Sequence, residues 1–259
     1  MILKNNLLMN SKYFTLCLCI ACFMSCNQEM HLEKIEAKRL EINDSLVSVS
    51  KIEDFIKPFR EHVNSNLDSV LAYSFDTYSK TDGDLNTAIG NLMADAVMEE
   101  ANPIFESRTG HKIDVVLLNH GGIRAILSKG NITTRTAYEI MPFENSVVVT
   151  ELKGTHIKEM IAYLQKAKRS HPISGLTIKL DKDYELIEAK INGELIDDNR
   201  TYYVATNDYL YSGGDSMDFF QKSDTLHDLD YRIRNVLIDY FTKKDTINPV
   251  IDNRFIKTN

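Results

Sequence analysis

The sequence predicts a mixed α+β fold, in which mixed β-sheets are flanked by helices. Apolar runs of strand length, such as residues 113–118, are typical of strands that are buried on both faces. Longer segments such as residues 52–67 carry apolar side chains three and four positions apart, which is the period of a helix. Strands and helices do not alternate strictly along the chain, so a mixed sheet is expected rather than a wholly parallel one.

The individual elements follow from the same two periods. Residues 32–43 nearly alternate apolar and charged residues, which predicts a strand exposed on one face. The other expected strands are residues 70–75, 113–118, 147–152, 175–180, 186–191, 195 onward, 202–206 and, as an edge strand, 254–256. Asn192-Gly193-Glu194 is a strong hairpin turn signal between two of these strands.

Four helices are expected from apolar stripes. The first spans residues 52–67, and the second carries its stripe from Ala88 to Val97, with Asp84 or Asn86 as its N-terminal cap. The third and fourth span residues 154–167 and 233–241. The stripe of the second helix is interpreted as core rather than as a ligand site.

The N-terminal region predicts export. Lys4 and Lys12 precede a twelve-residue apolar run, residues 13–24, which is too short to span a bilayer but suits a secretory signal. All four cysteines lie within the first 26 residues, so no disulfide can cross-link the folded part. Its stability must therefore come from an ordinary hydrophobic core.

The apolar run ends in a small residue followed by Cys26 and then by polar residues, which resembles a bacterial lipoprotein processing site. Cys22 is a competing site, but Cys26 is favoured because it leaves a longer apolar region and a polar mature end. The predicted organisation is a signal peptide over 1–25, a tether over 26–30 and one domain over 31–259. We expect a lipoprotein anchored in a membrane, facing the periplasm or the cell surface.

Removing residues 1–25 takes away two lysines and no acidic residue, so the net charge falls from −7 to −9. This acidic balance argues against nonspecific binding of a nucleic acid polymer. The sequence contains no long glycine, proline or serine linker and no internal repeat, which favours a single domain.

The candidate ligand-binding residues follow the ends of two predicted strands. The apolar run that ends at Leu118 stops at Asn119-His120-Gly121-Gly122, and Arg124 follows. Adjacent glycines let backbone N–H groups approach a ligand, and an arginine offers a planar fork for phosphate or carboxylate oxygens. On local chemistry alone, a Gly-Gly after a strand is more often only a turn.

The second piece repeats this arrangement. A strand that ends near Ala205 is followed by Asn207-Asp208, by exposed aromatic residues and by Gly213-Gly214-Asp215. Locally, Gly-Gly-Asp is better read as a turn closed by an Asx-type hydrogen bond. The ligand interpretation depends on the combination of the two pieces.

In combination, the motifs resemble the C-terminal, substrate-binding domain of the 5′-nucleotidase family. The family pattern is N-x-G-G-I-R, then P-F, then N-x-aromatic with a following G-G-D. This chain carries them in that order, at Asn119 to Arg124, Pro142-Phe143, Asn207 to Tyr209 and Gly213 to Asp215. Two further matches are Gly90-Asn91-Leu92 with Ala94-Asp95-Ala96, and Leu152-Lys153-Gly154. The resemblance covers residues 51 to the C-terminus and implies the layered fold of that domain.

The resemblance also implies roles for individual residues. Phe143 and Tyr209 would hold a nucleobase between their rings, Arg124 would reach the phosphate, Asn119 would bond near the phosphate or ribose, and Asp215 would accept hydrogen bonds from a ribose diol. The glycines that would allow close backbone approach are Gly121, Gly122, Gly213 and Gly214. Without the motifs, Phe143 reads as a core residue and Arg124 as a member of a surface ion pair.

The sequence lacks the chemistry for phosphate-ester hydrolysis on its own. The seven histidines are scattered, with no H-x-H, H-E-x-x-H or G-N-H-E motif, so no metal site is expected in this chain. In the family, the metal ligands belong to a separate N-terminal metallophosphatase domain, which the resemblance does not extend to. Divalent metals are therefore expected on a partner chain.

One departure weakens the expected phosphate site. Five residues before the glycine of the early G-N motif, the family places an arginine followed by a glutamate, and this chain has Leu85 and Asn86 there. Lys80 lies nearby, but an ammonium group is not equivalent to a guanidinium fork.

Three hypotheses follow from the sequence. The first is the nucleotide-recognition half of a 5′-nucleotidase, which contributes to catalysis only with a metallophosphatase chain and takes a nucleoside monophosphate or nucleoside. The second is a lipoprotein that binds nucleosides without chemistry. The third is an adhesion or structural protein that has kept the fold and lost the ligand. The sequence leaves the preferred base open.

Overall fold

The computed structural model describes residues 14, 16, 32–43, 45–223 and 225–258. The predicted signal peptide boundary, the tether, Cys22 and Cys26 lie outside these residues. The chain divides into two units, residues 1–53 and 54–259, which are described separately. In the part of the chain that the structure describes, no helix has the length and apolar character that crossing a bilayer requires.

In the first unit, the strand predicted over residues 32–43 is wrong, because these residues form no strand and their side chains are exposed. Ile35 and Ile42 are 78% and 90% exposed. Alternation of apolar and charged residues forms a strand only where a neighbouring strand accepts its backbone hydrogen bonds. No described residue of another strand pairs with this segment.

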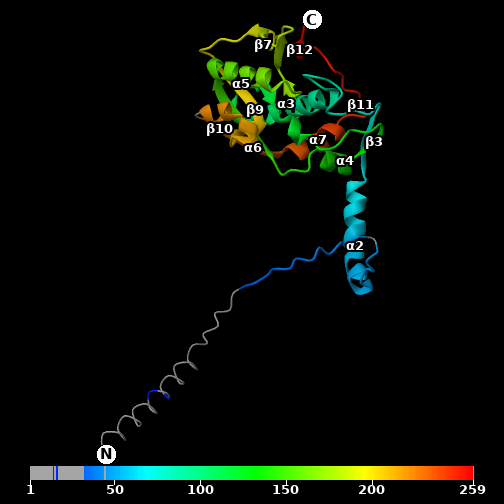
Figure 1. Ribbon diagram of the computed structural model, residues 1–259. Helices are drawn as coiled ribbons and strands as arrows, with labels where there is room; N and C mark the ends of the chain where they lie inside the picture. Colours follow the sequence, from blue (N-terminus) through cyan, green and yellow to red (C-terminus); the bar gives the residue numbers. More distant parts are fainter. Residues whose placement is uncertain (1–13, 15, 17–31, 44, 224, 259) are drawn as a thin grey trace, which may run out of the picture. The chain divides into compact units, whose positions relative to one another are not determined.

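The second unit contains three sheets and the helices that pack on them (Figure 1). The sheets have the strand orders β11-β1-β3, β10-β4-β9-β2-β5 and β12-β6-β7-β8. The strands are β1 Val70–Ser74, β2 Val115–Leu117, β3 Gly130–Thr133, β4 Ser146–Lys153, β5 Ile173–Ser174, β6 Leu176–Leu180, β7 Leu186–Ile191, β8 Glu194–Leu195, β9 Thr201–Asn207, β10 Leu226–Arg232, β11 Thr246–Ile247 and β12 Phe255–Lys257.

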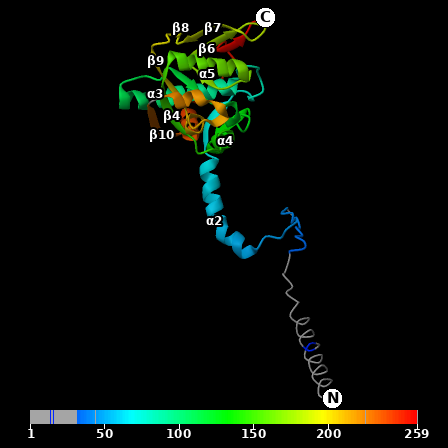
Figure 2. The same cartoon turned by 60° about the vertical axis from the view of Figure 1, so that its left-hand side comes forward.

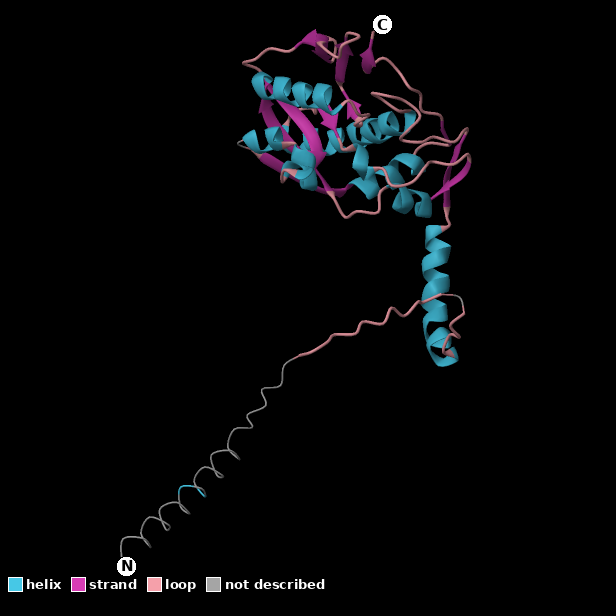
Figure 3. Ribbon diagram, in the orientation of Figure 1, coloured by secondary structure: helices cyan, strands magenta, loops and turns pink. Residues whose placement is uncertain are grey.

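The α-helices are shown in cyan in Figure 3 with the shorter 3₁₀ turns, and those other than α2, which has no buried residue, pack on these sheets. The α-helices are α2 Ser50–Leu67, α3 Ala88–Thr109, α4 Thr134–Ile140, α5 Gly154–Ala167, α6 Asp208–Tyr211 and α7 Ile233–Thr242. The predicted mixed α+β class is confirmed, because parallel pairs such as β2 with β9 share a sheet with antiparallel pairs such as β4 with β9.

Two hydrophobic cores lie on opposite faces of the five-stranded sheet. One face of β2, β4 and β9 packs against α3 and α7 through residues such as Val116, Val149 and Ala205. The opposite face packs against α5, which is covered on its other side by the four-stranded sheet. Figure 2 shows this second arrangement, with β6, β7 and β8 at the top and α5 directly beneath them. The unit is thus built in four layers of helix, sheet, helix and sheet.

The sequence periods located most of the long elements correctly. The helix predicted over residues 154–167 has the bounds of α5, and the hairpin turn at Asn192-Gly193 has the positive φ angles, 50° and 84°, that a two-residue hairpin of type I′ needs. The predicted edge strand near residue 254 is β12, which lies at the edge of its sheet.

The cap predicted for α3 is wrong. Thr87, and not Asp84 or Asn86, caps the helix by accepting the Gly90 N–H at 3.2 Å. The side chain of Asn86 is used elsewhere, because its amide donates to the carbonyl oxygens of Asp252 and Phe255 at 3.1 and 2.8 Å. This bond ties the C-terminal segment to the start of α3.

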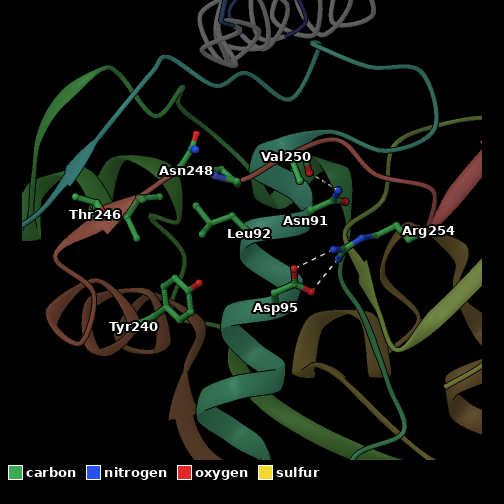
Figure 4. A pocket seen from close by; sticks show the side chains of 10 residues that line it. Asn91, Leu92, Asp95, Tyr240, Thr246, Asn248, Val250 and Arg254 are labelled. Carbon is green, nitrogen blue, oxygen red and sulfur yellow. Dashed lines mark hydrogen bonds and ion pairs between the residues drawn. The ribbon is translucent and has the colours of Figure 1, made fainter.

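Figure 4 shows how the same segment is held further along α3. Asn91 donates to the Val250 carbonyl at 2.9 Å, and Arg254 forms a two-pronged ion pair with the Asp95 carboxylate at 2.8 and 2.9 Å. A cavity of about 210 Å³ lies beside these contacts. The residues of the G-N-L-x-x-D-A motif therefore hold the C-terminal segment in place.

The fold predicts where a core substitution is costly. Leu164 of α5 is fully buried between the two sheets, so Leu164→Ala removes buried methyl groups and leaves a cavity. We expect the free energy of unfolding to fall by about 2–5 kcal/mol, measured by urea denaturation. Lys166→Ala, on the exposed side of the same helix, should change it by less than about 0.5 kcal/mol. Equal effects of the two substitutions would contradict the layer arrangement.

Candidate functional site

Strand pairing brings three distant segments of the chain to one edge of the five-stranded sheet. β2 and β9 are parallel neighbours, so the residues that follow them, beginning with Asn119 and with Asp208, emerge at the same edge. β4 is antiparallel to β9 and pairs Val147 with Asn207, so β4 begins at the edge where β9 ends. The segment just before β4, which contains Phe143, therefore reaches this edge too.

A cavity of about 430 Å³ lies at this edge. Its lining residues are Asn119, Gly121, Gly122, Arg124, Met141, Phe143, Asn145, Tyr209 and Asp215. Of the residues predicted from the sequence, the seven candidate site residues are among them, whereas Gly213 and Gly214, which were also expected to approach the ligand, are not. Two were missed, Met141 and Asn145, which flank the Pro-Phe motif; their closeness to that motif is the one signal in the sequence that points to them.

Two aromatic side chains in this cavity are open to solvent. Phe143 is 42% exposed and Tyr209 is 45% exposed, although Tyr209 follows the mostly buried strand β9. Neither ring belongs to a hydrophobic core of the described residues. The alternative reading of Phe143 as a core residue is therefore wrong.

The carboxylate of Asp215 is held from two sides. Asn119 donates from Nδ2 to Oδ2 at 2.9 Å, and the hydroxyl of Tyr209 donates to Oδ1 at 3.0 Å. The bond to the carboxylate raises the pKa of Tyr209. Tyr163 of α5 donates to the backbone carbonyl of Asp215 at 2.9 Å. Each carboxylate oxygen keeps a second lone pair, so the group can still accept hydrogen bonds from a ligand.

The glycine pair before Asp215 is a steric requirement. A Cβ on Gly214 would lie 2.5 Å from the ring of Tyr209. Gly213 has a φ of 91°, a backbone angle that residues with a side chain rarely adopt. Asp215 itself has a φ of 53°. The turn therefore lets the Tyr209 ring lie flat against the backbone while the Asp215 carboxylate points back to the Tyr209 hydroxyl.

The loop after β2, which contains His120, is held by hydrogen bonds to His171 and Ser170. The backbone N–H of His120 donates to Nδ1 of buried His171 at 3.3 Å, and Nδ1 of His120 lies 3.2 Å from both the carbonyl and the hydroxyl oxygen of Ser170. Burial lowers the pKa of His171 to about 4, so this imidazole is neutral at neutral pH. Both histidines contact the loop and neither lines the cavity.

Positive charge at the cavity comes from Arg124, whose guanidinium carbon lies 5.8 Å from the centroid of the Phe143 ring. Among the described residues it is the one cationic side chain that lines the cavity. Leu85 packs in the core beneath α5, and Asn86 is buried. The ammonium group of Lys80 donates to the carbonyl of Ile123 at 2.8 Å, next to Arg124 along the chain but outside the cavity lining.

The described residues contain no group of three or more histidine, cysteine, aspartate or glutamate side chains that could hold a metal ion. The arrangement supplies instead two exposed rings, an oriented carboxylate and one guanidinium. Their chemistry suits a ligand that has a planar ring, hydroxyl donors and a negative charge.

The neutral state of His171 predicts a pH dependence of stability. Between about pH 6.5, the ordinary pKa of histidine, and about pH 4, the unfolded chain binds a proton at His171 that the folded chain does not bind. The free energy of unfolding therefore falls as the pH decreases through this window. Urea denaturation at pH 4–7 should show a shallower fall for His171→Gln, and an NMR titration in which the His171 imidazole changes near pH 6.5 would contradict the prediction.

Comparison with known proteins agrees with this geometry. Residues 65–222 match the family model described as "5'-nucleotidase, C-terminal domain". The chain is 28% identical over 183 residues to the Trifunctional nucleotide phosphoesterase protein YfkN of Bacillus subtilis, covering 65% of this chain and 12% of that protein. It is 26% identical over 225 residues to the Apyrase of Tabanus yao, covering 77% of this chain and 40% of the apyrase.

Solved structures show the same fold. The 5'-nucleotidase precursor from Thermus thermophilus superposes with a TM-score of 0.66 at 23% identity, over 81% of this chain and 43% of that one. The chain thus spans less than half the length of each of these three proteins. The matched residues include every residue of the cavity, and the chain belongs to the 5'-nucleotidase C-terminal domain family.

Proposed function

We propose that this chain is the nucleotide-recognition half of a split 5'-nucleotidase. The observation that carries the proposal is the cavity at the edge of β2 and β9, where Phe143, Tyr209, Asp215 and Arg124 line one space of about 430 Å³. This volume lies within the range of small-molecule sites in proteins, about 300–1,000 Å³. The names of two similar proteins, a nucleotide phosphoesterase and a 5'-nucleotidase, support nucleotides as the ligand class.

Each group has a role that follows from its chemistry. The rings of Phe143 and Tyr209 stack on the base, which contributes about 1–3 kcal/mol per base. The carboxylate of Asp215, oriented by Asn119 and Tyr209, accepts hydrogen bonds from the ribose hydroxyls. Arg124 pairs with the phosphate. Gly121 and Gly122, which line the cavity, let the backbone approach the ligand closely.

Hydrolysis of the phosphate ester takes place with a second chain, a metallophosphatase. Divalent metals bound to that chain supply an activated water at neutral pH. The residues of this chain hold the base and ribose and thereby fix the position of the phosphate, which accelerates the reaction by orientation. A lipid attached to Cys26 anchors the exported chain, and with it the bound metallophosphatase, in a membrane.

Ligand binding tests the roles of the two rings. Isothermal titration calorimetry with adenosine should show weaker binding by Phe143→Ala and by Tyr209→Ala, by about 1–3 kcal/mol each, because each substitution removes one stacking surface. Phe75→Ala provides a matched control, since Phe75 is 53% exposed but does not line the cavity. Unchanged adenosine affinity in both cavity variants would rule out the proposed site.

Substitution of Arg124 distinguishes the binding of a nucleotide from the binding of a nucleoside. Arg124→Met should weaken binding of adenosine monophosphate about ten- to a hundredfold, the value of a charge-assisted hydrogen bond, while adenosine affinity stays the same. Lys129→Met, which removes an exposed cation outside the cavity, should change neither affinity. Equal affinity of wild type and Arg124→Met for adenosine monophosphate would contradict the proposed role of Arg124 in binding the phosphate.

A specific observation also favours the second function, a lipoprotein that captures nucleosides without chemistry. Leu85 and Asn86 are buried, so the site has one guanidinium where the family pattern has two. The two functions differ in one assay. Adding this chain to a metallophosphatase chain should increase phosphate release from a nucleoside monophosphate if the enzyme is split, and should have no effect if the chain only captures nucleosides.

A further inference from the structure

Helix α2 carries an apolar stripe that the described protein leaves uncovered. None of its eighteen residues is buried. Phe55, Phe59 and Val63 are spaced four residues apart, so they lie on one face, and they are 69%, 63% and 51% exposed. The rings of Phe55 and Phe59 are in contact, with centroids 5.8 Å apart.

An exposed apolar stripe of this kind indicates that another molecule packs against the helix. An isolated helix of this length is only marginally stable in water, and most helices in proteins are stabilised by packing of their apolar face. A row of large apolar side chains in solvent marks a surface that another molecule covers.

The C-terminal end of α2 is fixed close to the cavity. Arg135 of α4 donates to the Asp68 carboxylate at 2.7 Å and to the Asn64 side chain at 3.0 Å. α4 is seven residues long, about 10 Å, and the chain that leaves it supplies Met141 and Phe143 to the cavity. The C-terminal end of α2, next to Val63, therefore lies one short helix away from the residues that line the cavity.

The family match indicates at which end of the domain a catalytic partner is expected. The family match begins at residue 65, within α2, and the family is described as a C-terminal domain. A C-terminal domain follows an N-terminal part of its protein, and that part joins it at the start of the matched segment, which here lies at the end of α2. A catalytic chain that associates without a covalent link is best placed for the cavity if it binds at this point.

We propose that the face of α2 formed by Phe55, Phe59 and Val63 is the docking surface for the metallophosphatase chain. The inference rests on the proposed function, because it assigns a surface to the partner that the function requires. The aromatic pair provides the type of anchor that dominates binding energy at protein interfaces.

The test compares two double variants of α2. Phe55→Ala with Phe59→Ala removes the aromatic pair but keeps a strong helix former at both positions. Lys57→Ala with Glu61→Ala changes an exposed ion pair on the opposite face and serves as the control. The measured quantities are the concentration of this chain that gives half-maximal stimulation of phosphate release by the metallophosphatase, and the affinity for adenosine.

We expect the aromatic double variant to need at least tenfold more protein for half-maximal stimulation, with unchanged adenosine affinity and unchanged helix content by circular dichroism. The control variant should behave as wild type. Equal stimulation by the aromatic variant and wild type would overturn the docking surface while leaving the proposed function in place.

Two further outcomes would overturn the inference. If sedimentation shows that the wild-type chain is a dimer and the aromatic variant a monomer, a second copy of this chain covers α2 instead. If wild type binds adenosine but stimulates no metallophosphatase, the split enzyme is contradicted and the docking surface with it. Normal stimulation by both wild type and the aromatic variant contradicts the docking surface alone, so failure of the inference and failure of the proposed function are distinguishable.

Discussion

The parallel pairing of β2 with β9 is the constraint on which the candidate site depends. Val115 pairs with Val204 and Val116 with Ala205, although about ninety residues separate the two strands along the chain. Since both strands run in the same direction, their following loops meet at one edge, and antiparallel β4 begins there. Any change that shifts this register would separate Asn119 from Asp215 and open the cavity.

The groups at this edge are held in place before any ligand binds. Asp215 accepts one hydrogen bond at each carboxylate oxygen, and the loop after β2 rests on buried His171. Such preorganisation lowers the entropic cost of binding, because fewer side chains lose freedom when the ligand arrives. The single guanidinium at the cavity makes the base and ribose the larger contributors to recognition in the proposed function.

The sequence predicted those parts of the fold that depend on local periodicity. The buried strands, α5 and the hairpin at Asn192-Gly193 each carry a continuous pattern, so their positions follow from neighbouring residues. The failures concern partners distant in the chain. The alternating segment 32–43 has no neighbouring strand among the described residues, and Asn86 does not cap α3 because its Oδ1 accepts from Asn91 Nδ2 and from the Asp252 N–H instead.

The seven candidate site residues, which were identified by motifs and not by periodicity, line one cavity, and their role in binding stays a prediction. Asn145 and Met141 were missed, since their place in the cavity follows from how β4 and α4 direct the chain, which no local pattern encodes. The bonds of Tyr209 and Asn119 to Asp215 likewise emerge only from the three-dimensional arrangement.

The same edge of the sheet links the proposed function with the proposed docking surface, because α4 connects the end of α2 to Phe143. The most direct test of the central claim is a crystal structure of the protein with adenosine monophosphate. The account predicts the base between the rings of Phe143 and Tyr209, the ribose hydroxyls on Asp215 and the phosphate at Arg124. Density for the nucleotide at any other place, or an empty cavity at saturating nucleotide, would contradict it.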